Sequence, residues 1–160
     1  MTCLLALLLS SPADAGGLAA GVFGTFDAPL QADSSSSAGP GFAGFVGYEL
    51  PVPKVHVRPE LQGRLVTAAE AFTLAAGATA TVGGNARFGG AAHVGVPLTG
   101  GSGPLPMFDI GPVFEVKVTK LLLTATTAYS FIPTTQYKCG TCEQPSQQWL
   151  LSGLSVGFLL

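Results

Sequence analysis

The sequence predicts an all-β fold, an eight-stranded antiparallel up-and-down β-barrel, on three observations. Apolar and polar residues alternate strictly in segment after segment, as in FDIGPVFEVKV at 108–118. Such alternation is typical of a strand with two different faces. The charged residues of the strands share one of those faces, and long connections alternate with tight ones along the chain.

Eight strands are expected, with ends uncertain by about 2–4 residues. Turn-forming residues separate them. The Ala-rich run at 68–80 also suits a helix, but Thr73, Thr79 and Thr81 favour a strand there. The predicted strands are 17–29, 41–50, 54–66, 71–82, 86–98, 107–118, 120–132 and 149–160.

The connections between these strands are of two kinds. Those after the first, third, fifth and seventh strands are QADSSSSAGP, TAAE, TGGSGPLP and PTTQYKCGTCEQPSQQ, of which only TAAE is short. Those after the second, fourth and sixth are PVP, GGN and the junction at Thr119-Lys120. This asymmetry is typical of a barrel in a bacterial outer membrane, with both chain ends on the periplasmic side.

The composition excludes several classes of protein. Charged residues make up 10% of the 160 residues, against about 25% in soluble domains, so a charged coat is missing. A net charge of −2 indicates neither a nucleic-acid partner nor a polybasic membrane patch. No window of 18 continuous apolar residues exists, so no helix is expected to cross a bilayer.

The first fifteen residues, MTCLLALLLSSPADA, resemble a secretory signal peptide, because an apolar run precedes the A-x-A pattern Ala13-Asp14-Ala15. A start upstream of Met1 would explain why no Lys or Arg precedes the run. A buried N-terminal strand or helix is the alternative. The expected organisation is a signal peptide at 1–15 and a barrel at 16–160.

The charges distinguish the two faces of the strands, because none falls on the apolar face. Six of the charged residues outside the predicted signal peptide lie in connections or tight turns: Asp33, Glu70, Lys138, Glu143, Lys54 and Lys120. The other nine lie on the polar face of predicted strands: Asp27, Glu49, Arg58, Glu60, Arg64, Arg87, Asp109, Glu115 and Lys117.

Two architectures are consistent with this distribution of charged residues. A secreted, soluble, lipocalin-like barrel that binds an apolar ligand would turn the apolar face inward, whereas a membrane barrel would turn it outward. The polar faces of the first, second, fourth and eighth strands are rich in Gly, Ala, Ser and Thr, for example Ala19-x-Gly21 and Gly153-x-Ser155-x-Gly157. Such faces make a poor water coat but suit the narrow interior of eight strands, into which long charged side chains reach. We therefore predict a transmembrane β-barrel.

Aromatic residues support this prediction. Those of the apolar face cluster at the two ends of the strands, as expected of girdles at the two membrane boundaries. The predicted girdles are Phe26, Phe42, Phe72, Phe108 and Phe131 at the long-connection end, and Tyr48, Phe88 and Phe158 at the other.

With these features the chain resembles the small eight-stranded outer-membrane barrels of the OmpA membrane-domain and OmpX type, over residues 16–160. The ending GLSVGFLL looks like the assembly signal of that family, although Leu160 stands where an aromatic is customary and Phe158 is the nearest substitute. The resemblance implies a Gram-negative outer-membrane protein. It does not extend to a periplasmic peptidoglycan-binding domain.

The inward charges raise the question of chemistry. A gate or a proton path is one interpretation, and a paired network that stabilises a filled barrel is the other. Four basic and five acidic groups nearly balance, which favours the paired network. Its predicted members are Arg58, Glu60, Arg64, Arg87, Asp109, Glu115 and Lys117. A diffusion porin would need more strands.

No catalytic residue, metal site or cofactor is predicted. His56 and His93 both face inward, without the carboxylate or cysteine partners of a metal site. Lipid-modifying barrel enzymes need a hydroxyl beside an imidazole, and no Ser follows closely after His93. Such an enzyme remains the alternative function.

The last long connection carries Cys139 and Cys142 in KCGTCE. In an exported protein this pair favours a disulfide over a metal or redox site. We expect a non-enzymatic barrel anchored in the lipid bilayer of the outer membrane, with the long connections binding an extracellular protein or surface ligand. No oligomeric state follows from the sequence.

Overall fold

The computed structural model describes residues 16–30, 37–66, 71–98, 106–133, 135–136, 143–144 and 147–160. Residues 1–15 and the pair Cys139 and Cys142 lie outside the described residues. The signal peptide and the disulfide therefore stay predictions. Within the described ranges, no helix is long and apolar enough to cross a membrane.

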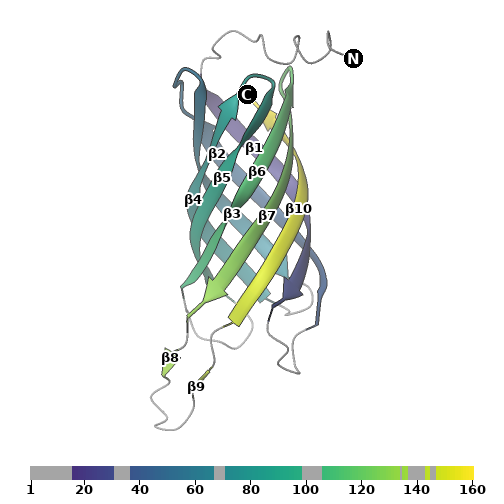
Figure 1. Cartoon of the computed structure of the whole chain (residues 1–160), viewed down its shortest axis with the longest axis vertical. Helices are drawn as coiled ribbons and strands as arrows, with labels where there is room; N and C mark the ends of the chain where they lie inside the picture. Colours follow the sequence, from purple (N-terminus) through teal and green to yellow (C-terminus); the bar gives the residue numbers. More distant parts are fainter. Residues whose placement is uncertain are drawn as a thin grey trace.

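Eight long strands form a closed antiparallel barrel (Figure 1), so the predicted fold is confirmed. Each strand pairs with its neighbours in sequence, and β1 and β10 close the ring. No predicted boundary differs from the observed one by more than two residues. The barrel strands are β1 (Gly17–Pro29), β2 (Gly39–Glu49), β3 (Val55–Val66), β4 (Ala71–Gly83), β5 (Ala86–Pro97), β6 (Met107–Val118), β7 (Leu121–Ile132) and β10 (Gln147–Leu159).

A small second sheet was not predicted. β8 (Thr135–Gln136) and β9 (Glu143–Gln144) pair within the connection between β7 and β10. These two-residue strands consist of Thr, Gln and Glu and have no apolar alternation to reveal them.

The three tight turns lie at the same end of the barrel as both ends of the described chain, where the N–H of Leu160 donates to the carbonyl of Leu18. Two of the turns contain non-glycine residues with positive φ, Lys54 at 67° and Thr119 at 58°, and Gly83 in the third has φ of 133°. A left-handed conformation is uncommon for a β-branched residue such as Thr119.

The apolar face of each strand points outward. Val22, Ile110 and Leu154 are 67%, 63% and 72% exposed, whereas Arg58 and Glu115 are 3% and 1% exposed. A soluble barrel with an apolar ligand cavity requires the reverse arrangement, so that alternative is wrong.

Small residues make room for large ones inside. Phe23 and Phe45 are buried with their ring centroids 5.3 Å apart. A Cβ atom on Gly21 would lie 2.5 Å from the Phe45 ring. Glycine at this inward position therefore allows the aromatic pair to fit within a barrel of eight strands.

Candidate functional site

The centre of the barrel is filled by Arg58 and its two carboxylate partners. Arg58 Nε donates to Glu60 Oε2 and Arg58 Nη2 donates to Glu115 Oε1, both at 2.8 Å. All three residues are at least 95% buried. The guanidinium carbon also lies 5.0 Å from the centroid of the Phe45 ring, within the range of a cation–π contact. β3 and β6 are thereby joined across the lumen.

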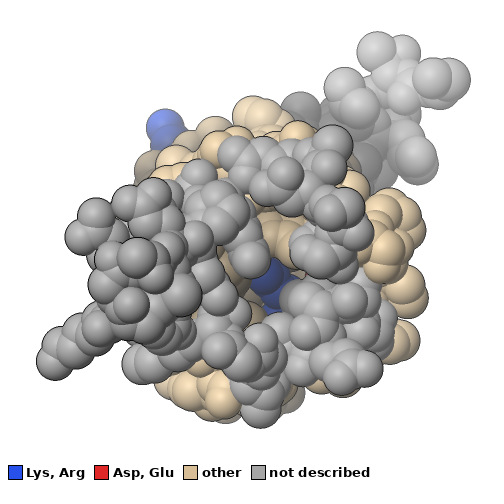
Figure 2. All heavy atoms as spheres, turned by 90° about the horizontal axis from the view of Figure 1, so that it is seen from below, with Lys and Arg blue, Asp and Glu red and all other residues tan. Residues whose placement is uncertain are grey.

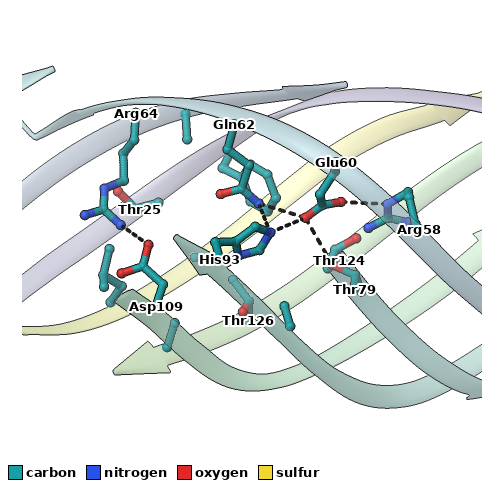
Figure 3. A pocket seen from close by; sticks show the side chains of 16 residues that line it. Thr25, Arg58, Glu60, Gln62, Arg64, Thr79, His93, Asp109, Thr124 and Thr126 are labelled. Atoms are coloured by element: carbon teal, nitrogen blue, oxygen red, sulfur yellow. Dashed lines mark hydrogen bonds and ion pairs between the residues drawn. The ribbon is translucent and has the colours of Figure 1, made fainter. Parts of the chain in front are cut away.

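Hydroxyl, amide and imidazole groups contact these carboxylates as well. Glu60 Oε1 accepts from Gln62 Nε2 at 2.9 Å and Thr79 Oγ1 at 3.1 Å, and it lies 2.8 Å from His93 Nε2 (Figure 3). Thr81 and Thr124 donate to Glu115 at 3.4 and 3.5 Å. Every carboxylate oxygen of Glu60 and Glu115 thus has a hydrogen-bond donor, as buried charges require.

A second group lies toward the tight turns. Arg87 Nη1 donates to Glu49 Oε2 at 2.8 Å, and His56 Nδ1 lies 3.1 Å from the other oxygen of Glu49. Arg87 Nε also donates to the carbonyl of Gly84 at 3.0 Å. Lys117, another predicted member of the interior network, lies near the tight-turn end of β6 and is partly buried.

The third group lies toward the long connections and is less well paired. Arg64 Nη1 is 3.5 Å from Asp109 Oδ2, and Arg64 Nη2 is 3.3 Å from Met107 Sδ. Among the described residues, Arg64 Nε, Asp109 Oδ1 and Ser130 Oγ are buried without a hydrogen-bond partner, whereas the Thr25 side chain is hydrogen-bonded to Asp27.

A cavity of about 60 Å³ lies between this third group and the central network. Its polar lining includes Thr25, Arg64, His93 and Asp109, and Phe23, Ala43 and Leu151 line its apolar part (Figure 3). Viewed from the long-connection end, Lys or Arg atoms are visible within the barrel (Figure 2).

Neither a hydroxyl–imidazole hydrogen bond nor a cluster of metal-binding side chains is found among the described residues. None of the hydrogen bonds found among the described residues joins a Ser or Thr hydroxyl to a histidine, and His93 Nε2 is engaged by Glu60 and Gln62. Within the same residues, no group of three or more His, Cys, Asp and Glu side chains is suited to a metal ion.

The residues predicted as girdles lie on the outer surface at the strand ends. Phe42, Phe88 and Phe158 are 62%, 61% and 54% exposed, and Phe26, Phe72, Tyr48 and Phe108 are also exposed. Phe131 is only partly exposed.

Sequence reasoning missed the neutral partners Gln62, Thr79, Thr81 and Thr124. They lie on the same inward faces as the charged residues, so the alternation placed them correctly. No signal in the sequence showed which carboxylate each would reach.

No protein-family model matches the chain, and no curated protein matches it. Among solved structures, it is similar to the crystal structure of Neisserial surface protein A, with a TM-score of 0.58 and 11% sequence identity. The match covers 94% of this chain and 100% of that protein. The two proteins share a fold. At this identity the likeness does not extend to residues of the interior, which we interpret from their own geometry.

Proposed function

We propose that the chain is an integral β-barrel protein of the bacterial outer membrane, without enzymatic activity, whose barrel anchors the long connections at the cell surface. The observation that carries the proposal is the inverted surface, with Val22, Ile110 and Leu154 outside and Arg58 and Glu115 inside. A continuous apolar exterior of this kind is unstable in water and is covered by acyl chains in a bilayer.

Further features support the membrane position. β1 to β7 and β10 have 11 to 13 residues each, slightly more than the about 9–11 that a tilted strand needs to cross. The aromatic residues at both rims suit the two lipid–water boundaries. The signal-like segment at 1–15 suits export.

The lengths of the connections support the proposed orientation. Barrels in outer membranes have short periplasmic turns and long extracellular loops, so the tight turns and both chain ends would face the periplasm. The long connections, including 134–146 with Tyr137 and Lys138, would face outward. Loops on a rigid scaffold are favourable places for binding, and Neisserial surface protein A is by its name a surface protein.

The interior is proposed to be a structural network rather than a gate. Arg58, Glu60 and Glu115 satisfy one another, and their neutral neighbours complete the hydrogen bonds. Such pairing fixes the strands across the lumen at low cost in unpaired charge.

The test combines fractionation with surface labelling. In cells, the protein should be found in the outer-membrane fraction, and its gel mobility should change on boiling. An epitope inserted between Gly140 and Thr141 should bind antibody on intact cells, whereas one inserted between Gly84 and Asn85 should not. Recovery in the aqueous phase without detergent would refute the proposal, and the reversed labelling pattern would refute the orientation.

The absence of enzymatic activity has its own test. Expression of the wild type and of His93→Ala should give identical lipid A mass spectra. A lipid A modification that depends on His93 would establish the alternative enzyme.

A further inference from the structure

Two hydroxyl-bearing residues lie side by side on the outward face of the barrel. Thr127 of β7 and Ser152 of β10 are cross-strand neighbours, on two strands that run next to each other at the front of Figure 1. Both residues are exposed, and we call them the outer hydroxyl pair. The other Ser and Thr residues of the eight barrel strands all lie on the inward face: Thr25, Thr73, Thr79, Thr81, Thr124, Thr126, Ser130 and Ser155.

The outer hydroxyl pair lies near the middle of the barrel wall, away from both rims. Each residue is five positions from the long-connection end of its strand, and β7 and β10 have 12 and 13 residues. In the proposed membrane position this is the acyl-chain region, and not the boundary where the aromatic girdles lie. Acyl chains offer no hydrogen-bond donor or acceptor, so hydroxyls in contact with them alone lose the hydrogen bonds that water provides.

The backbone beside the outer hydroxyl pair is also incompletely paired. Between β6 and β7, the pairing of residues stops after Ile110 and resumes at Val113. In this register Pro112 lies opposite Thr127, and proline has no N–H to donate. The carbonyl of Thr127 therefore receives no hydrogen bond from Pro112. Hydroxyl and carbonyl groups thus meet at one place on an outer wall that is otherwise largely apolar.

The chemistry of the outer hydroxyl pair favours a second copy of the same chain as its partner. A hydroxyl both donates and accepts. A two-fold axis between β7 and β10 would set Thr127 of each copy against Ser152 of the other, which is the reciprocal contact of an isologous interface. Cross-strand pairing keeps the two residues at a similar depth, as a two-fold axis along the membrane normal requires. A lipid with a hydroxylated chain is the other occupant that the test must separate.

We propose that the outer hydroxyl pair is the centre of a two-fold interface between two copies of the chain within the bilayer, with β7 and β10 of each copy in contact. The inference goes beyond the proposed function and rests on its membrane location. A hydrogen bond of Ser or Thr between membrane-spanning segments changes association by about threefold or more. The dimer is therefore reversible and dissociates when it is diluted in lipid.

The test measures the association of the mature chain in phosphatidylcholine vesicles. Cys139 and Cys142 are replaced by Ser, and a single cysteine at Lys120, an exposed position in a tight turn, carries a donor or an acceptor dye. Energy transfer between the dyes should rise with the ratio of protein to lipid and then saturate. It should fall when unlabelled chain is added.

A double variant and a control make the measurement specific. Thr127→Val/Ser152→Ala removes both hydroxyls and nearly keeps the shape of the surface, so the dissociation constant of the dimer should rise about tenfold. Val82→Ala changes an outward residue of β4, which lies on the opposite side of the ring from β10. It should leave the dissociation constant unchanged.

Crosslinking locates the interface. A single cysteine at Ala125, the next outward position on β7 beside Thr127, should form a covalent dimer with a short bismaleimide. A single cysteine at Ala78, in the middle of β4, should form much less of it. If the double variant fails to fold, the comparison of these two positions decides.

Energy transfer no greater than that between non-associating dyes at the same density would overturn the proposal. Undiminished association of the double variant would also overturn it, because the hydroxyls would then face lipid, and so would equal crosslinking at Ala125 and Ala78. Insertion into vesicles and the change of gel mobility on boiling are checked in every sample. A chain that inserts but stays monomeric refutes the interface alone, whereas a chain that does not insert refutes the membrane location and the interface together.

Discussion

Replacement of Arg58 by Met tests the central network most severely. Arg58 is 3% exposed and its guanidinium makes two contacts of 2.8 Å, to Glu60 and Glu115. Removing one partner of a buried ion pair costs about 3–5 kcal/mol, because the other charge stays buried without compensation. We therefore expect Arg58→Met to lower the free energy of unfolding by about 3–5 kcal/mol.

The loss of Arg58 should destabilise the Glu115 carboxylate more than the Glu60 carboxylate. Glu60 keeps Gln62, Thr79 and His93 within 3.1 Å, whereas Glu115 keeps only hydroxyl contacts of 3.4 and 3.5 Å. Neutralising Glu115 should therefore recover part of the loss, and the double variant Arg58→Met/Glu115→Gln should be more stable than the two single effects together predict, by about 1–3 kcal/mol.

The assay is equilibrium unfolding in urea of the barrel refolded into lipid vesicles. The fluorescence of Trp149, the single Trp of the chain, reports the unfolding of β10. The coupled network would be contradicted if the free energy of unfolding of Arg58→Met stays within about 1 kcal/mol of the wild-type value. It would also be contradicted if the effects of Arg58→Met and Glu115→Gln on that free energy are additive.

Three further substitutions test packing, turn geometry and the outer face. Gly21→Ala should destabilise the barrel by about 1–3 kcal/mol because its Cβ meets the Phe45 ring. The control Gly24→Ala, whose Cβ meets nothing within 4 Å, should be neutral or slightly stabilising. Equal effects of the two substitutions in urea unfolding would contradict the close packing of Gly21 against Phe45. Thr119→Gly should raise stability by up to about 1 kcal/mol, since φ of 58° strains a β-branched residue; a loss in the same assay would contradict the strain. Leu154→Arg, at an outward site with 72% exposure, should cost about 2–4 kcal/mol in vesicles if the site lies near the bilayer midplane, and a neutral result would argue against lipid contact.

Much of the fold was predictable because a strand has a period of two residues. Once 55–66 is a strand, Arg58, Glu60 and Arg64 must share a face, and the apolar residues between them must share the other. The tight turns were predictable from GGN and from the short junction at Thr119-Lys120. Strand count and connection lengths then fixed the topology.

The contacts across the lumen were not predictable. Arg58 and Glu115 are 57 residues apart in sequence and lie on non-adjacent strands. Whether their side chains meet depends on the stagger of the whole barrel, which no local pattern encodes.

The direct test of the account is the environment of the outward side chains in a bilayer. Single cysteines carrying nitroxide labels at Val22, Ile110 and Leu154, in a chain whose Cys139 and Cys142 are replaced by Ser, are compared for relaxation by oxygen and by a water-soluble nickel chelate. We expect all three labels to be relaxed strongly by oxygen and weakly by the nickel chelate, as acyl chains around them require. Strong relaxation by the nickel chelate at all three sites would show that the apolar face meets water and would contradict a barrel embedded in lipid.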